Sequence, residues 1–272
     1  MLDDQTLQDL ANELVRVAGV VGVVLGGSRA RGEHTPQSDF DLGLYYRQPL
    51  DLPHLRSLAQ QVAGPTAQLT DRGGWGQWVD GGGWLRIDDT AVDWIYRDLD
   101  RVHACWADAS AGRYAFHMQV GHPLGVPDFS YPGELALAAV LADPSSELTD
   151  LQQRTRDYPP ELGKALVRGL WEADFALQVA KKAVNRGDTA YVAGCLFHAV
   201  LLCAHALHGH AGRWLINEKG AVAAAGRLPG APPRFSERAQ DVLGRLGRQP
   251  HELSRAIDVA SELLKETTDA CR

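Results

Sequence analysis

The sequence predicts an α/β protein, in which a small mixed β-sheet with helices on one side occupies residues 1–150 and an α-helical bundle occupies residues 151–272. The first part predicts a sheet because short apolar runs, such as the β-branched run 20–25 (VVGVVL), alternate with helical patterns. The second part predicts a bundle because apolar residues recur there at helical spacing over long stretches. A chain of 272 residues also has the length of about two domains.

Helical patterns and strand patterns alternate along the first part. The predicted elements are helices at 4–18 and 51–63 and strands at 20–25, 39–46, 84–88 and 91–98. Asp89 and Thr90 are expected to connect the last two strands as a hairpin. Residues 101–135 resist assignment because Pro123, Pro127 and Pro132 interrupt every long pattern.

The second part is predicted to begin after a polar turn at 143–146, with the boundary near Asp150. A helix is expected over 161–186, with an apolar stripe, and Asp188 is the expected N-cap of the next helix. That next helix is apolar nearly all round, which predicts a central position. The last helix is expected to start near Pro250.

Charge is divided unevenly between the two parts. Residues 1–150 carry 10 basic and 21 acidic residues, a net charge of −11, whereas residues 151–272 carry 17 and 13, a net charge of +4. An acidic first part repels a phosphate backbone, so nucleic acid is not the expected partner. It attracts divalent metals and cationic small molecules instead.

The remaining composition indicates a cytoplasmic protein. No apolar run approaches 18 residues, so no membrane span is expected. The first ten residues are acidic and lack the basic and apolar regions of a signal peptide. The four cysteines form no CxxC pair, which favours free thiols in a reducing compartment over a zinc or redox site.

The turn after the first strand is the first candidate binding element. A strand leads into Gly26-Gly27-Ser28, where the absence of Cβ atoms lets backbone N–H groups approach a ligand closely. Ser28 adds a hydroxyl, and a following helical turn directs its positive end the same way. This combination predicts a phosphate-binding turn. The P-loop pattern is absent, and the first part contains no lysine.

Two carboxylates follow on the second strand. Asp39 and Asp41 are two residues apart, so both side chains leave the same face of the strand, about 6–7 Å apart. Carboxylates at that spacing suit hard cations such as Mg²⁺, which also bind phosphate oxygens. Either motif alone is weak, but ten residues separate Ser28 from Asp39 and predicted strands lie on both sides.

Together these residues resemble the motif of the DNA polymerase beta-like nucleotidyltransferase superfamily. The form GGSRARG, followed by SDFDLG, is similar to its small-molecule branch, the aminoglycoside and lincosamide nucleotidyltransferases. The resemblance is specific over residues 20–46 and moderate over 84–98. It implies Mg²⁺-dependent chemistry, with two ions, on a nucleoside triphosphate substrate.

The resemblance also implies a third carboxylate on a later strand, and Asp93 interrupts an apolar strand at the matching place. Asp93 is expected to complete the metal site with Asp39 and Asp41 or to accept the proton of the attacking hydroxyl. A salt bridge to an arginine is the structural alternative. Asp88 and Asp89 are interpreted as turn residues, and Glu134 and Glu172 are weaker candidates for the base or an acceptor-binding carboxylate.

Basic residues supply the candidate nucleotide contacts. Gly27 and Ser28 are expected to hold the outer phosphates, and Arg29 either reaches a phosphate or pairs with a nearby acid. In the resembling enzymes a lysine of the helical domain contacts the triphosphate, which makes Lys181 and Lys182 candidates here. A snorkelling surface role is the alternative for both lysines.

Aromatic residues near the predicted site have two interpretations. Tryptophans usually anchor cores and loops. Trp75, Trp78 and Trp84 lie in a Gly-rich stretch beside the predicted site, where a stacking role is the alternative.

The expected function is transfer of a nucleoside monophosphate, AMP from ATP in the first instance, to a hydroxyl of a small cationic molecule such as an aminoglycoside antibiotic. Two alternatives remain open at this point. One is a protein-modifying AMP transferase or antitoxin-type regulator, and the other is a catalytically inactive nucleotide-binding protein. The sequence does not indicate the oligomeric state.

Overall fold

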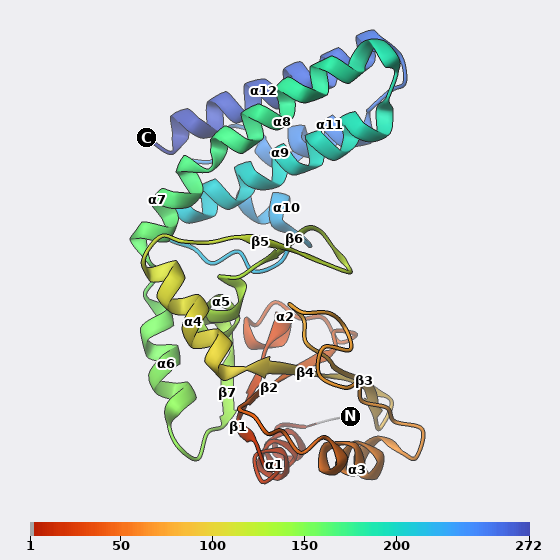
Figure 1. Cartoon of the computed structure of the whole chain (residues 1–272), viewed down its shortest axis with the longest axis vertical. Helices are drawn as coiled ribbons and strands as arrows, with labels where there is room; N and C mark the ends of the chain where they lie inside the picture. Colours follow the sequence, from red (N-terminus) through yellow and green to blue (C-terminus); the bar gives the residue numbers. More distant parts are fainter. Residues whose placement is uncertain (1–2) are drawn as a thin grey trace. The chain divides into compact units, whose positions relative to one another are not determined.

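The computed structural model describes residues 3–272 and contains two units (Figure 1). One unit holds the chain up to Asp108 together with Ala115–Asp157, and the other holds Ala109–Tyr114 and Tyr158–Arg272. The chain stays with the first unit past residue 150 because Leu148 and Leu151 of one further helix are buried in that unit's core.

The first unit is built on a five-stranded mixed sheet, as expected. Its strands are β1 (Val20–Leu25), β2 (Phe40–Tyr46), β3 (Gly82–Ile87), β4 (Thr90–Asp98) and β7 (Ala139–Ala142), in the order β3-β4-β2-β1-β7. The β2–β4 pair is parallel, and the other neighbours are antiparallel. The two-residue turn between β3 and β4 is Asp88-Asp89, both with positive φ, which is the backbone of a tight hairpin.

Helices cover both faces of this sheet, not one face as the sequence pattern suggested. Leu7 and Leu55 pack on one face, from α1 (Asp4–Leu14) and α3 (Leu52–Ala63). On the other face, Val102, Leu135 and Leu148 form a second core. They come from α4 (Leu99–Ser110), α5 (Ser130–Leu137) and α6 (Glu147–Arg156). The helices of the second face lie in and around residues 101–135, which the sequence analysis left unassigned.

That stretch, residues 101–135, also contains a two-stranded sheet formed by β5 (Phe116–Gln119) and β6 (His122–Pro127). Pro123 and Pro127 lie near the ends of β6, where a missing N–H is tolerated. Pro132 lies in the first turn of α5, where its N–H would have no intrahelical partner.

The second unit is helical. Its helices are α7 (Pro160–Arg168), α8 (Leu170–Ala183), α9 (Thr189–His210), α10 (Ala221–Ala225), α11 (Phe235–Gly244) and α12 (Pro250–Ala270), with a 3₁₀ turn at Val184–Arg186. The expected helix 161–186 is divided at Gly169. Asp188 caps α9 by accepting a hydrogen bond from the Tyr191 N–H, and α12 begins at Pro250 with a capping box.

The first unit also contains the short helix α2 (Gly27–Ala30). In the second unit, α9 is the central helix. Among residues 3–272, α9 has the length and mean hydropathy, 1.8, of a membrane-crossing helix. It packs against α7, α8, α10, α11 and α12, and 61% of its most apolar window is buried. This burial is typical of the core helix of a bundle.

A partly buried ion pair ties α5 to β4. Glu134 on α5 accepts two hydrogen bonds from Arg97 on β4, Nε to Oε2 at 2.6 Å and Nη2 to Oε1 at 2.9 Å. The Arg97 side chain is only 11% exposed. A guanidinium in that position needs its partner, because a buried charge without compensation is costly.

We expect Glu134→Gln to lower the free energy of unfolding by about 3 kcal/mol, because it leaves the Arg97 charge buried without its counter-charge. Glu13→Gln is the matched control, since it removes an exposed i,i+3 pair with Arg16 and is expected to cost less than about 0.5 kcal/mol. Urea unfolding followed by circular dichroism measures both. Equal effects in the two variants would contradict a structural role for the Arg97–Glu134 pair.

Candidate active site

Two of the sequence-predicted carboxylates are direct neighbours across the sheet. Asp41 on β2 and Asp93 on β4 are register partners in the parallel pair, so their side chains leave the same face. Asp39 immediately precedes β2 and, two residues from Asp41, belongs to the same face. The structure therefore brings the three predicted acidic residues to one place, where β2 begins beside the middle of β4.

The predicted phosphate-binding turn lies against this acidic row. β1 ends at Leu25, and the Gly26 N–H donates to the Asp41 carbonyl at 2.7 Å. Gly27 has a φ of 64°, and a Cβ there would lie 1.8 Å from Asp41 Oδ2. Only glycine fits this position. The N–H groups of Gly27 and Ser28 open the single turn of α2, where backbone donors have no intrahelical partner.

The row accumulates negative charge without a basic neighbour in contact. Burial, followed by the charges of Asp39 and Glu134, raises the pKa of the Asp41 carboxyl. Burial, followed by the charges of Asp41 and Asp39, raises the pKa of Asp93 to about 6. None of the three carboxylates forms an ion pair anywhere in residues 3–272, so the salt-bridge alternative for Asp93 does not apply.

The donor chemistry of the row suits a hard cation. Carboxylate oxygens are the ligands that Mg²⁺ prefers, and mutual repulsion between them is relieved when a cation binds. Across the described chain, no three His, Cys, Asp or Glu side chains are already close enough to form a complete metal cluster.

Arg29 holds the segment in front of Asp39. Its guanidinium donates to the Ser38 carbonyl at 2.7 and 3.0 Å and to the Asp39 carbonyl at 3.1 Å, and it lies 3.8 Å from the centre of the Phe40 ring. Ser38 in turn accepts a hydrogen bond from the Thr35 N–H at 3.0 Å. This geometry makes Arg29 a positioning residue for Asp39. Arg31 pairs with Glu33 at 3.1 Å.

The sequence did not reveal the partnership of Arg97 and Glu134 behind the row. Arg97 is four residues after Asp93 on the same strand, hence on the same face, and its charge opposes the shift of the Asp41 pKa. Glu134, a weaker candidate for the base, is held by Arg97. The even spacing of Asp93 and Arg97 along one strand was the sequence signal that places both side chains on the same face.

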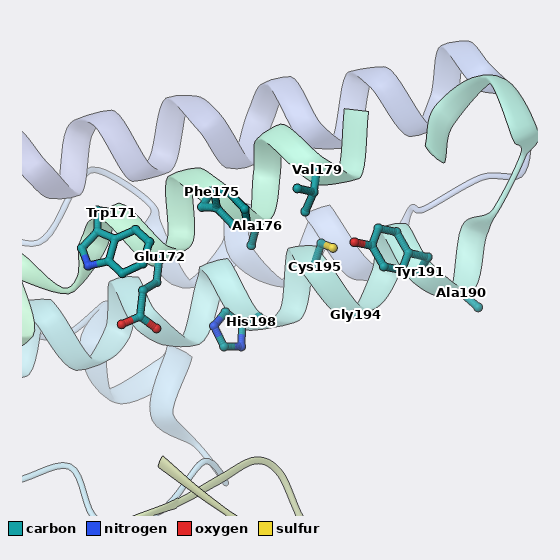
Figure 2. A pocket seen from close by; sticks show the side chains of 10 residues that line it. All are labelled: Trp171, Glu172, Phe175, Ala176, Val179, Ala190, Tyr191, Gly194, Cys195 and His198. Carbon is teal, nitrogen blue, oxygen red and sulfur yellow. The ribbon is translucent and has the colours of Figure 1, made fainter. Parts of the chain in front are cut away.

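Lys181 and Lys182 belong to the second unit. Both are exposed in the last turn of α8, where Lys181 donates to Gln178 at 3.3 Å. The same helix carries Glu172 and lines, with α9, a groove of about 690 Å³. Figure 2 shows Trp171 and Glu172 at one end of this groove and Tyr191 at the other. Whether either lysine contacts a nucleotide stays a prediction.

A known family model matches part of the first unit. Residues 7–80 match the family model described as a nucleotidyltransferase domain, a range that contains the glycine turn, Asp39 and Asp41. Residues 7–80 are therefore similar to a nucleotidyltransferase domain. This match supports a transferase of the nucleotidyltransferase type and accords with the superfamily whose motif the sequence resembles.

Other comparisons are more distant. Among solved structures, a nucleotidyltransferase-like protein from Exiguobacterium sibiricum 255-15 is 14% identical, with a TM-score of 0.49, over 96% of this chain and 74% of that one. No curated protein matches the chain. Asp93 lies outside the range matched by the family model, so its place in the site rests on its register with Asp41.

We expect Gly27→Ala to be far more damaging than Gly32→Ala, although both residues have positive φ, 64° and 69°. A Cβ at Gly32 meets nothing within 4 Å, so that variant measures backbone strain alone, about 1 kcal/mol. A Cβ at Gly27 additionally displaces the Asp41 carboxylate. Thermal unfolding and nucleotide binding measure the difference. Indistinguishable variants would contradict the close contact between the turn and Asp41.

Asp93→Asn is expected to raise the melting temperature by about 2–4 °C at pH 7.5 in the presence of EDTA, because it removes a partly buried charge beside Asp41. The pKa of Asp93 is raised to about 6, so the native protein takes up a proton as pH falls through 6, before the unfolded chain does. The wild type thereby recovers stability on acidification, and the advantage of the variant shrinks toward pH 5. Calorimetry at both pH values checks this, and a lower melting temperature of the variant at pH 7.5 would contradict it.

Proposed function

We propose that this nucleotidyltransferase moves a nucleoside monophosphate, AMP from ATP in the first instance, to a hydroxyl group of a small cationic molecule. The observation that supports it most is the acidic row of Asp41 and Asp93, with Asp39 beside it, set against the Gly27 turn. A turn of free backbone donors and a row of carboxylates are what a phosphate chain carrying hard cations needs.

The reaction is an in-line displacement at the α-phosphorus. The acceptor oxygen forms a bond to the α-phosphorus, the bond to the bridging oxygen of the β-phosphate breaks, and pyrophosphate leaves with the electron pair. The acceptor's hydroxyl proton passes to a carboxylate. Asp93, the register partner of Asp41, would accept this proton where it does not itself hold a cation, and another carboxylate would accept it otherwise.

Two Mg²⁺ ions, when bound, would neutralise the phosphates and polarise the reacting oxygens. Asp39, Asp41 and Asp93 are the residues that would hold them. The N–H groups of Gly27 and Ser28 would bind the outer phosphates, and Arg29 would keep Asp39 in place through its backbone carbonyl. Lys181 and Lys182 are proposed as further phosphate contacts.

Charge supports a small cationic acceptor, with an aminoglycoside-type antibiotic as the leading class. Residues 1–150 carry a net charge of −11, and the acidic row belongs to this part of the chain. Such a field attracts ammonium groups and repels polyanions. A cytoplasmic location accords with the four free cysteines.

Asp41→Asn is expected to reduce transfer by at least about 100-fold, equivalent to about 2.7 kcal/mol of transition-state stabilisation, because it removes a charge from the row while keeping its shape. Asp88→Asn is the matched control, since Asp88 is exposed in the β3–β4 turn and asparagine tolerates its positive φ. Pyrophosphate release with each nucleoside triphosphate, Mg²⁺ and a panel of aminoglycosides measures both variants.

The control should keep wild-type activity. If Asp41→Asn retains more than a tenth of the wild-type rate, the assignment of Asp41 to the reacting centre is wrong. If label from an α-labelled nucleotide appears on co-incubated protein rather than on the small molecules, the acceptor is a protein hydroxyl.

A further inference from the structure

We propose that the stacked indoles of Trp84 and Trp75 are the platform on which the acceptor lies, and that the platform is built for an aminated sugar ring. This inference rests on the proposed function and adds the residues that select the substrate. It concerns the free edge of the sheet in the first unit, a surface that the reaction itself does not explain.

Strand register places Trp84 next to the reacting carboxylates. Asp41 pairs with Asp93 across β2 and β4, and Asp93 pairs with Trp84 across β4 and β3. Directly paired residues project from the same face with Cβ atoms about 5 Å apart. The neighbouring β3 residues Leu85 and Ile87 face the opposite side, in the core under α1 and α3. On the face opposite α1 and α3, the side chains of Asp41, Asp93 and Trp84 therefore follow one another across β2, β4 and β3.

The indole of Trp84 has no core role. It is 75% exposed at an edge strand, where a large apolar side chain is normally avoided. Its ring stacks on that of Trp75, with centroids 4.8 Å apart and planes at 19°. Burial contributes little to keeping Trp84 in this position, which is the pattern of a binding surface rather than of packing.

The loop that carries Trp75 is firmly held from two sides. Asp80 is buried and accepts hydrogen bonds from the Tyr46 hydroxyl at 2.6 Å and the Gly73 N–H at 2.8 Å. Gln119 of β5 accepts from the Trp78 N–H at 3.1 Å and donates to the Trp75 carbonyl. A platform fixed in this way loses little conformational entropy when a ligand binds.

A groove runs along this edge and has room for a small molecule. Its volume is about 550 Å³, within the range of ligand sites, and both indoles line it. Gln68, Thr70 and Arg86 provide polar groups in the same lining. The charge of Arg86 is compensated by the Asp89 carboxylate at 3.7 Å and the Asp89 carbonyl at 2.7 Å.

The chemistry of this surface fits an aminated sugar. Indole faces bind the apolar face of a pyranose ring, and they attract ammonium groups by cation–π interaction. The carboxylate row beyond Trp84 favours the same positive charge. Trp84 is also the register partner of Asp93, so the platform adjoins the strand that carries this carboxylate. A nucleobase on the platform is the competing occupant, and the experiment separates the two.

The test measures binding of kanamycin and neomycin, without nucleotide or metal, by isothermal titration calorimetry. We expect Trp84→Ala to weaken binding at least about tenfold and Trp84→Phe to weaken it less than about threefold, because an aromatic face remains. Met118→Ala is the matched control, since it removes an apolar side chain that is 98% exposed elsewhere in this unit. Methyl glucoside, which lacks the ammonium groups, should bind more weakly than either antibiotic.

The inference is overturned if neither aminated probe binds the wild type, or if Trp84→Ala binds them as tightly as the wild type does. It is also overturned if Trp84→Ala loses the stabilisation that Mg·ATP gives to the wild type, because the platform then holds the nucleobase. Failure of the proposed function looks different: Mg·ATP then stabilises none of the proteins, while the aminated probes still bind the wild type and not Trp84→Ala.

Discussion

The parallel pairing of β2 with β4 is the constraint on which the rest of the site depends. It places Asp41 directly beside Asp93, two carboxylates that burial and mutual repulsion both oppose. Three neighbouring features of the chain position this pair. The Gly27 turn lies against Asp41, Arg29 fixes the backbone before Asp39, and the Arg97–Glu134 pair anchors α5 behind the row.

Repulsion between these carboxylates lowers the stability of the protein when no cation is bound. Like charges held together favour the protonated native state, whereas a bound cation relieves the repulsion and also binds phosphate oxygens. A short turn that tolerates only glycine at position 27 carries a similar constraint. Strain and unpaired charge concentrated at one place, inside a sheet with a core on each face, are what is expected where ligand binding provides the compensation.

Several elements of the structure could be predicted from local sequence patterns alone. The apolar run of β1, the spacing of Asp39 and Asp41, the cap at Asp188 and the start of α12 at Pro250 depend on neighbours in sequence, and each was predicted. The layer formed by α4, α5 and α6 was not predicted. Prolines interrupt the pattern around α5, and the helical spacing of Leu99, Val102, Cys105 and Ala109 in α4 was overlooked. Helices were consequently expected on one face of the sheet only.

Features that depend on the pairing of strands could not be predicted from the sequence. Asp93 was predicted from a resemblance, but only the register shows that it touches the row and that Trp84 continues it. Arg29 was expected to contact phosphate or an acid, and it binds two carbonyls. A side chain's choice among nearby acceptors is decided by loop geometry, which composition and spacing do not encode.

Binding of a nucleotide and Mg²⁺ to the row is tested by the thermal stability of the wild type with ATP, GTP, CTP and UTP, each with and without Mg²⁺, with Asp41→Asn in parallel. We expect a shift of several degrees with at least one nucleotide, dependent on Mg²⁺ and lost in the variant, because the cation offsets the negative charge of both the row and the phosphates. No shift with any nucleotide, or an equal shift in Asp41→Asn, would contradict it.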